Sequence, residues 1–236
     1  MIPLRDINRS QRFPLVTVAL IVINALLFFY ELSLGERLQG FLLQSAFSPA
    51  KAFGSGPGAG LDFGLASGLL SMFLHGGWMH FLGNMLFLWI FGDNIEDRLG
   101  HVRFVVFYLL CGYAATYAHA FANPGSQMPA IGASGAIAGV LGAYLVLFPG
   151  ARVVTLIFLG FFSQLVEIPA LVYLGLWFVM QFFSGVASLS ADTTAAEGGV
   201  AWFAHLGGFV AGPLCYFLLG GRRKGGGPTP YRSPYS

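Results

Sequence analysis

The sequence predicts an all-α membrane protein, a six-transmembrane-helix bundle with both termini cytoplasmic. Three observations support this class. Hydrophobic residues make up 56% of the 236 residues and charged residues only 9%, whereas soluble domains carry roughly 25% charged residues. Six stretches are apolar over nearly all of the roughly 20 residues that a helix needs to cross a bilayer. Basic residues gather on one side of these stretches, as expected for cytoplasmic segments.

Each predicted span is an apolar run bounded by charges or helix breakers. The first run follows Arg5, Arg9 and Arg12, as in a secretory signal. It is nevertheless long enough to cross a bilayer, and no small-x-small cleavage site follows it, so we expect a retained helix. The run over residues 153–162 is too short for a span, and we expect an interfacial segment or a hairpin there. The predicted spans are residues 14–32, 79–95, 102–121, 131–148, 169–187 and 200–219.

The positions of lysine and arginine orient these spans. With the N-terminus inside, ten of the 12 basic residues lie in inner segments, and only Arg37 and Lys51 lie outside. We therefore expect a cytoplasmic N-terminal segment over residues 1–13, a membrane domain over 14–220 and a disordered cytoplasmic tail over 221–236. The connection over residues 33–78 then lies outside, and its apolar run 69–74 predicts partial contact with the membrane interface.

The composition also excludes several partners and cofactors. No stripe of basic residues interleaved with aromatic residues indicates nucleic acid. Cys111 and Cys215 lie inside apolar runs, where a free cysteine acts as a small hydrophobic residue, so we expect no disulfide, metal or other cofactor. No Asp or Glu lies deep in a predicted span, which argues against a proton or cation pump. The oligomeric state is not indicated.

Polar residues inside spans are costly, which makes them candidate functional residues. His80 and Asn84 are four residues apart and share a helix face at the outer entrance of the second span. Ser134 begins the fourth span between Gly132 and Gly135, where free backbone N–H groups can receive an anion. Taken alone, each cluster has a structural alternative, a bond between helices for the first and a backbone bond or a tight interface for the serine.

The third cluster is His205, which shares a face of the sixth span with Gly208 and Gly212. Alone it is best interpreted as a packing histidine. All three clusters lie at the outer ends of their spans, and together they supply what acyl transfer requires. Ser134 is the candidate nucleophile and His205 its base. Asn84, His80 and the backbone N–H of Ser134 are candidate oxyanion donors. With no carboxylate available, the sequence indicates a Ser–His dyad.

At these residues the chain resembles the rhomboid family of intramembrane serine proteases, bacterial members in particular. The family's motifs of the second, fourth and sixth helices are matched by His80-x-x-x-Asn84, by Gly132-x-Ser134-Gly135 and by Ala204-His205 with Gly208 and Gly212. The resemblance implies a six-helix rhomboid-like bundle in the bacterial inner membrane that cleaves single-pass membrane proteins near the outer face. It implies Ser134 as nucleophile, His205 as base, and His80, Asn84 and Gly132 as the oxyanion and substrate-binding residues.

The chain departs from the family pattern at two places. Residues 66–72 lack the Trp-Arg pair that many members carry in the first outer loop. Ala138 stands where some members place a tyrosine that stacks on the catalytic histidine, so another residue must support His205. By resemblance, the fifth span around residues 177–183 and the loop 188–199 are expected to move and admit substrate.

Other functions remain as alternatives. A relative that binds membrane helices without cutting them would use the same scaffold, although such proteins typically lack the serine or the histidine. A channel or transporter would use the polar cavity as a path, yet the polar residues cluster on one side of the membrane. A metalloprotease needs His-Glu-x-x-His, which is absent. An aspartyl protease needs two embedded aspartates, and Asp93 has no partner.

Overall fold

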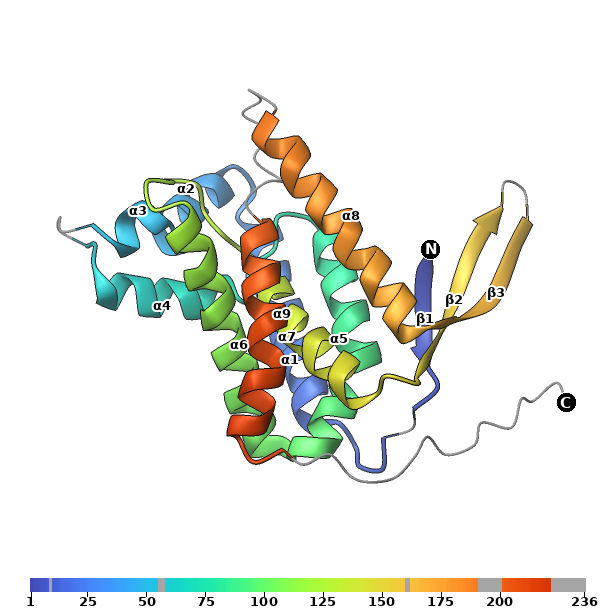
Figure 1. Cartoon of the computed structure of the whole chain (residues 1–236). Coiled ribbons are helices and arrows are strands. Elements are labelled where there is room, and N and C mark those ends of the chain that lie inside the picture. The colour runs from blue at the N-terminus through green and yellow to red at the C-terminus, as the bar shows by residue number, and fades with distance from the viewer. Residues whose placement is uncertain (9, 55–57, 160–161, 191–200, 222–236) are drawn as a thin grey trace, which may run out of the picture.

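The computed structural model describes residues 1–8, 10–54, 58–159, 162–190 and 201–221. Six long helices coincide, within a few residues at most ends, with the six predicted spans (Figure 1). These helices are α1 (Leu15–Ser33), α5 (Trp78–Leu99), α6 (His101–Ala122), α7 (Ser134–Leu147), α8 (Ala170–Ser190) and α9 (Ala201–Leu218). Among the described helices, α1 and α6 are long and apolar enough to cross a membrane by length and composition, while α7 and the described apolar parts of α8 and α9 are shorter.

The connection between α1 and α5 is folded rather than extended. It contains a 3₁₀ turn (Gly35–Arg37) and the helices α2 (Leu38–Ser45), α3 (Pro49–Ala52) and α4 (Leu61–Ser71). Helix α4 packs on α6, because the Tyr113 hydroxyl donates a hydrogen bond of 2.8 Å to the Leu65 carbonyl. A Cβ on Gly68 would lie 3.2 Å from the Tyr113 ring, which is a tight contact.

A three-stranded antiparallel sheet corrects the all-α prediction. Its strands are β1 (Ile2–Asp6), β2 (Arg152–Leu159) and β3 (Phe162–Pro169), in the order β1-β2-β3. The hairpin alternative for the segment after the fourth predicted span is therefore confirmed, and the N-terminal segment adds a strand that the sequence analysis did not predict. The proline in β1 lies on an edge strand, where a missing N–H is tolerated.

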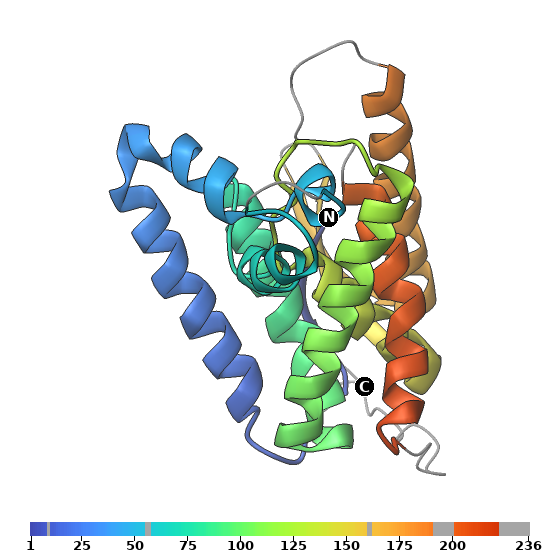
Figure 2. The same ribbon diagram turned by 90° about the vertical axis from the view of Figure 1, so that its left-hand side faces the viewer.

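The centre of the bundle is formed by α6, α7 and α9, which approach one another through glycines. A Cβ on Gly208 would collide with the carbonyl oxygen of Gly135, and one on Gly212 would collide with that of Gly139. A Cβ on Gly139 would also lie 2.5 Å from the Cys111 sulfur. The predicted small-residue packing is confirmed, and α9 lies between α6 and α8 against α7 (Figures 1 and 2).

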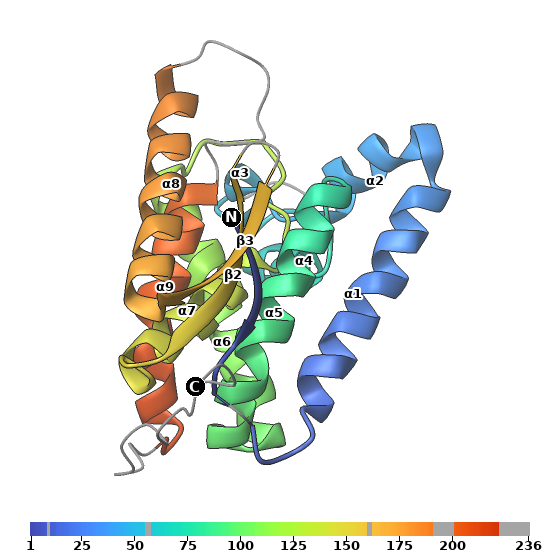
Figure 3. The ribbon, with the colours of Figure 1, turned by 90° about the vertical axis from the view of Figure 1, so that its right-hand side faces the viewer.

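Helix α1 is hydrogen-bonded to α5 at its beginning. The Glu96 carboxylate of α5 accepts hydrogen bonds of 2.8 Å from the backbone N–H groups of Val16 and Thr17, and one of 2.7 Å from the Thr17 hydroxyl. Figures 2 and 3 show α1 close to the bundle at this end and leaning away from it toward α2. A buried carboxylate thus holds the end of α1 opposite to α2.

Candidate active site

The structure brings together Ser134 and His205, which are 71 residues apart in the chain. The His205 Nε2 lies 2.8 Å from the Ser134 Oγ. Ser134 is the first residue of α7 and is partly exposed, whereas His205 on α9 is buried. Because α7 and α9 are in backbone contact through their glycines, the helices themselves set the separation of the two side chains. The serine hydroxyl is therefore within hydrogen-bond reach of a base.

The other ring nitrogen of His205 has no hydrogen-bond partner among the described residues. The ring is instead packed against Trp177 of α8, with ring centroids 5.6 Å apart and an interplanar angle of 48°. Ala138, at the position where a stacking tyrosine was considered, is fully buried within α7. Trp177 is therefore the aromatic support of His205, and the sequence analysis did not assign it that role.

Gly132 shapes the loop that leads to Ser134. Its φ of +125° is disfavoured for any residue with a side chain. A Cβ at this position would also lie 2.6 Å from the His80 Nε2 and 3.5 Å from the Ser134 Oγ. The missing side chain thus leaves a small space that faces both the histidine and the serine.

His80 borders the same region from α5, and Asn84 lies one turn further along that helix. The Gly76 N–H points at the His80 Nδ1 across 3.4 Å, so in the neutral ring the proton is carried by Nε2, the atom that faces Gly132. Asn84 is only 7% exposed, and its Nδ2 has no hydrogen-bond partner. The Asn84 Nδ2 is therefore a buried N–H donor without a partner among the described residues, and the His80 Nε2 is the ring atom nearest to the position of a Gly132 side chain.

A buried carboxylate that the sequence analysis overlooked holds the entrance to α5. Glu31, at the outer end of α1, is 1% exposed and accepts hydrogen bonds of 3.0 and 3.2 Å from the His75 backbone N–H. The His75 ring stands edge-on to His80, with centroids 5.2 Å apart. Burial, and secondly the proximity of His80, lowers the pKa of His75 to about 4. His75 is therefore neutral at neutral pH. The sequence signal that would have indicated Glu31 is a charged residue within an apolar run.

The loop before Ser134 is also held by the connection between α1 and α5. The Gly132 N–H donates to the Ser71 carbonyl at 2.8 Å, and the Ser71 hydroxyl accepts from the Phe47 N–H at 2.8 Å. The Ala130 N–H donates to the Phe47 carbonyl at 2.8 Å. This connection therefore positions the candidate nucleophile although it contains none of the candidate site residues.

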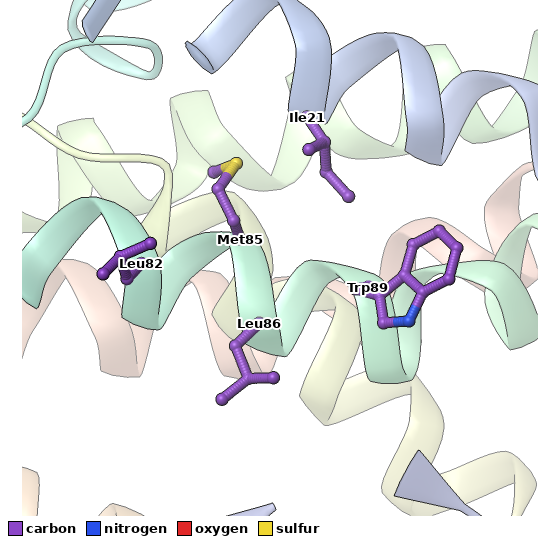
Figure 4. A pocket seen from close by; sticks show the side chains of 5 residues that line it. All are labelled: Ile21, Leu82, Met85, Leu86 and Trp89. Carbon is purple, nitrogen blue, oxygen red and sulfur yellow. The ribbon is translucent and has the colours of Figure 1, made fainter. Parts of the chain in front are cut away.

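An apolar groove lies away from this site. It is lined by Ile21 of α1 and by four residues of α5, which are Leu82, Met85, Leu86 and Trp89 (Figure 4). At 100° per residue these α5 positions lie on the face opposite to His80 and Asn84. The groove consequently does not belong to the Ser134 region.

Two expectations from the sequence concern metal binding and the segments that follow α8 and α9. Among the residues that the structure describes, no group of three His, Cys, Asp or Glu side chains could hold a metal ion. The loop 188–199, expected to move with the fifth span, lies largely outside the described residues, as does nearly all of the tail 221–236.

The fold and this region define a bundle of apolar helices with a serine–histidine pair at one end. The comparison with protein families identifies this class. A family model described as the rhomboid domain matches residues 64–222, which is more than half of the chain. The chain belongs to the rhomboid family, and it is a helical membrane protein.

Individual relatives are similar over parts of their length. Rhomboid protein 1, mitochondrial, of Saccharomyces cerevisiae is 31% identical over 148 residues, covering 61% of this chain and 39% of the yeast protein. RHOMBOID-like protein 4 of Arabidopsis thaliana is 31% identical over 167 residues, covering 67% and 37%. The human presenilin-associated rhomboid-like protein, mitochondrial, is 36% identical over 97 residues, covering 40% and 25%. The chain thus spans about a quarter to two fifths of these relatives, and their eukaryotic origin does not support the bacterial assignment.

Proposed function

We propose that this chain is an intramembrane serine endopeptidase that hydrolyses peptide bonds of single-pass membrane proteins through a Ser134–His205 dyad. The observation that carries the proposal is the 2.8 Å contact between the His205 Nε2 and the Ser134 Oγ in a member of the rhomboid family. The relatives include rhomboid-like proteins whose names state no activity, so catalysis has to be tested directly.

The reaction follows from the groups around Ser134. The Ser134 Oγ attacks the carbonyl carbon of the substrate bond, and its proton moves to the His205 Nε2. The carbonyl oxygen becomes an oxyanion that accepts hydrogen bonds from the Asn84 Nδ2, the His80 Nε2 and the Ser134 backbone N–H. When the C–N bond breaks, the leaving amine takes the proton from His205. Water then attacks the acyl-serine, with His205 as base again, and releases the acid and the free serine.

The proposed topology places this chemistry at the outer membrane face. The six long helices are the proposed spans of a membrane domain over residues 14–220, between a cytoplasmic segment 1–13 and a cytoplasmic tail 221–236. The bias of lysine and arginine toward one side supports this orientation. Movement of α8 around residues 177–183 is the proposed route of substrate entry.

Cleavage of a tagged single-span substrate by the purified protein in liposomes tests the proposal. Ser134→Ala should give no product. Ser33→Ala is the matched control, because Ser33 ends α1 and bonds only to the Tyr30 carbonyl. Product from the Ser134→Ala protein would refute the mechanism. If the folded parent protein gives no product either, reaction with a serine-directed phosphonate distinguishes the two remaining explanations. Labelling of Ser134 would show that the serine is reactive and that a substrate requirement is unmet. Absence of labelling would favour a protein that binds membrane helices without cleaving them.

A further inference from the structure

One face of α1 brings an aromatic ring and a carboxylate to the start of α5. Phe28 and Glu31 are three residues apart, so they share a face of the helix, and both are 1% exposed. The Phe28 ring stacks on the Phe81 ring, with centroids 4.5 Å apart and an interplanar angle of 7°. Both oxygens of the Glu31 carboxylate accept from the His75 N–H. The outer end of α1 therefore contacts residues on either side of the first residue of α5, Trp78.

Glu31 is buried without a basic partner. Among the residues that the structure describes, the one ion pair joins Glu96 and His101. An ionisable side chain inside a membrane helix is costly, and its partner is the best guide to what it does. The partner here is the His75 backbone N–H. This bond needs an oxygen acceptor at this place, which a glutamate or a glutamine can supply.

The segment that Glu31 holds also borders the His80 ring. The Gly76 N–H, one residue after the His75 N–H, points at the His80 Nδ1 across 3.4 Å. The His75 ring stands edge-on to both His80 and Phe81, with centroids 5.2 and 5.4 Å apart. A displacement of the His75 backbone would therefore move both the Gly76 N–H and a ring against which His80 packs.

The contact at Nδ1 determines which nitrogen of His80 carries the proton. In a neutral imidazole the nitrogen that faces an N–H donor is the acceptor, so the proton lies on Nε2. A Cβ on Gly132 would lie 2.6 Å from this Nε2 and 3.5 Å from the Ser134 Oγ. The position of the Gly76 N–H thus decides whether His80 presents an N–H on the side of the serine.

We propose that Glu31 is a positioning residue for His80. It fixes the His75–Gly76 segment, and this segment keeps the His80 proton on Nε2, where it can be donated to the oxyanion. The role in the reaction rests on the proposed function, whereas the effect of Glu31 on the His80 tautomer does not.

Nitrogen-15 NMR of the histidine rings at neutral pH tests the tautomer. The measurement uses the Ser134→Ala protein, so its outcome is independent of cleavage. The chain has five histidines, and the His80 signals are those that His80→Gln removes. We expect the proton on Nε2 when Glu31 is present. Glu31→Met fills similar space without an oxygen acceptor and should move the two His80 shifts toward each other, as in a mixture of tautomers. Glu36→Met, in the exposed turn after α1, is the control that should leave them unchanged.

Steady-state kinetics of the same substitutions in the parent chain test the consequence for cleavage. Glu31→Met should lower kcat by about tenfold, less than the loss of a complete oxyanion donor, and leave KM within about twofold. Glu31→Gln retains an oxygen acceptor for the His75 N–H and should restore most of the rate. Glu31→Asp retains the charge but shortens the side chain by one methylene, so it should behave like Glu31→Met.

Two results would overturn the proposal. One is a His80 proton on Nδ1 when Glu31 is present. The other is a set of His80 shifts that Glu31→Met leaves unchanged, which would assign Glu31 a role in stability alone. Glu31→Asp repeats both measurements if Glu31→Met does not fold. If the shifts respond as expected but the parent protein cleaves nothing, the positioning of His80 is supported and the proposed function fails.

Discussion

The two ends of the helix bundle differ in whether their buried polar side chains have hydrogen-bond partners. At the Ser134 end, the Asn84 Nδ2, the His205 Nδ1 and both ring nitrogens of His75 are buried without hydrogen-bond partners among the described residues. At the other end, Glu96 accepts three hydrogen bonds from the start of α1 and also contacts the His101 ring.

A second carboxylate at the end opposite to Ser134, that of Asp6, is also hydrogen-bonded. Asp6 of β1 accepts hydrogen bonds from the Tyr144 hydroxyl at 2.7 Å and from the Asn94 side chain at 3.0 Å, and Asn8 donates to Tyr144 in turn. A buried polar group without a partner costs about 1–3 kcal/mol. One end therefore holds buried polar atoms without partners among the described residues, while the other uses its polar groups to hold the fold.

The largest expected effect comes from His205→Gln. It should reduce cleavage by about 10⁴-fold or more, because the serine loses its base. The free energy of unfolding should change by less than about 1.5 kcal/mol, since glutamine fills much of the site. Cleavage assays and thermal unfolding in detergent measure the two quantities. His119→Gln, a buried histidine of α6 outside the site, is the control that should still cleave.

Glu96→Ala should produce the opposite pattern. Removing the carboxylate leaves the N–H groups of Val16 and Thr17 unpaired and should lower stability by about 1–3 kcal/mol for each group. The cleavage rate per folded molecule should stay within about threefold of the parent, because the site lies at the other end. A large loss of that rate with normal stability would break the comparison between the ends.

Asn84→Ala should lower kcat by about 10²–10³-fold through loss of one oxyanion donor. Stability should not fall, because the variant removes a buried donor that has no partner in the resting protein. Steady-state kinetics on a single-span substrate separate kcat from KM. An effect on KM alone would mean that Asn84 binds substrate without stabilising the oxyanion.

A graded effect, spread over several pH units, is the pH dependence of stability that we expect from Asp6. Burial raises the pKa of this carboxyl from 3.8 to about 7. Between these values the folded chain keeps a proton that the unfolded chain has released, so stability should decrease as the pH rises through this window. Asp6→Asn should flatten the dependence. Thermal unfolding from pH 4 to pH 8 measures it, and identical profiles for the two proteins would contradict the assignment to Asp6.

The parts of the fold that the sequence predicted depend on local patterns. Runs of apolar residues located the six helices, and the spacing of His205 with Gly208 and Gly212 indicated that the histidine shares the face through which α9 packs. The pairing of Ser134 with His205 was accessible because both residues stood at the outer ends of predicted spans. Hydrophobic periodicity and the predicted orientation of the spans were sufficient to predict these features.

The missed features depend on partners far away in the chain. β1 forms because it pairs with β2 about 150 residues later, a register that no local pattern encodes. Trp177 supports His205 only because α8 packs against α9. Glu31 lies within the last residues of an apolar run. Its bond to the His75 N–H depends on the packing of α1 against the loop before α5. Such contacts follow from tertiary packing, which hydropathy does not describe.

The glycine contacts between α7 and α9 have a consequence for large mutational scans. Gly142, Gly208 and Gly212 leave no space for a methyl group between α7 and α9, so substitutions there should push apart the two helices that carry Ser134 and His205. A scan scored by activity alone would give these glycines the same profile as the two side chains of the dyad. Scoring the same library for membrane-inserted protein as well would separate them, because only the glycine variants should be depleted in both screens.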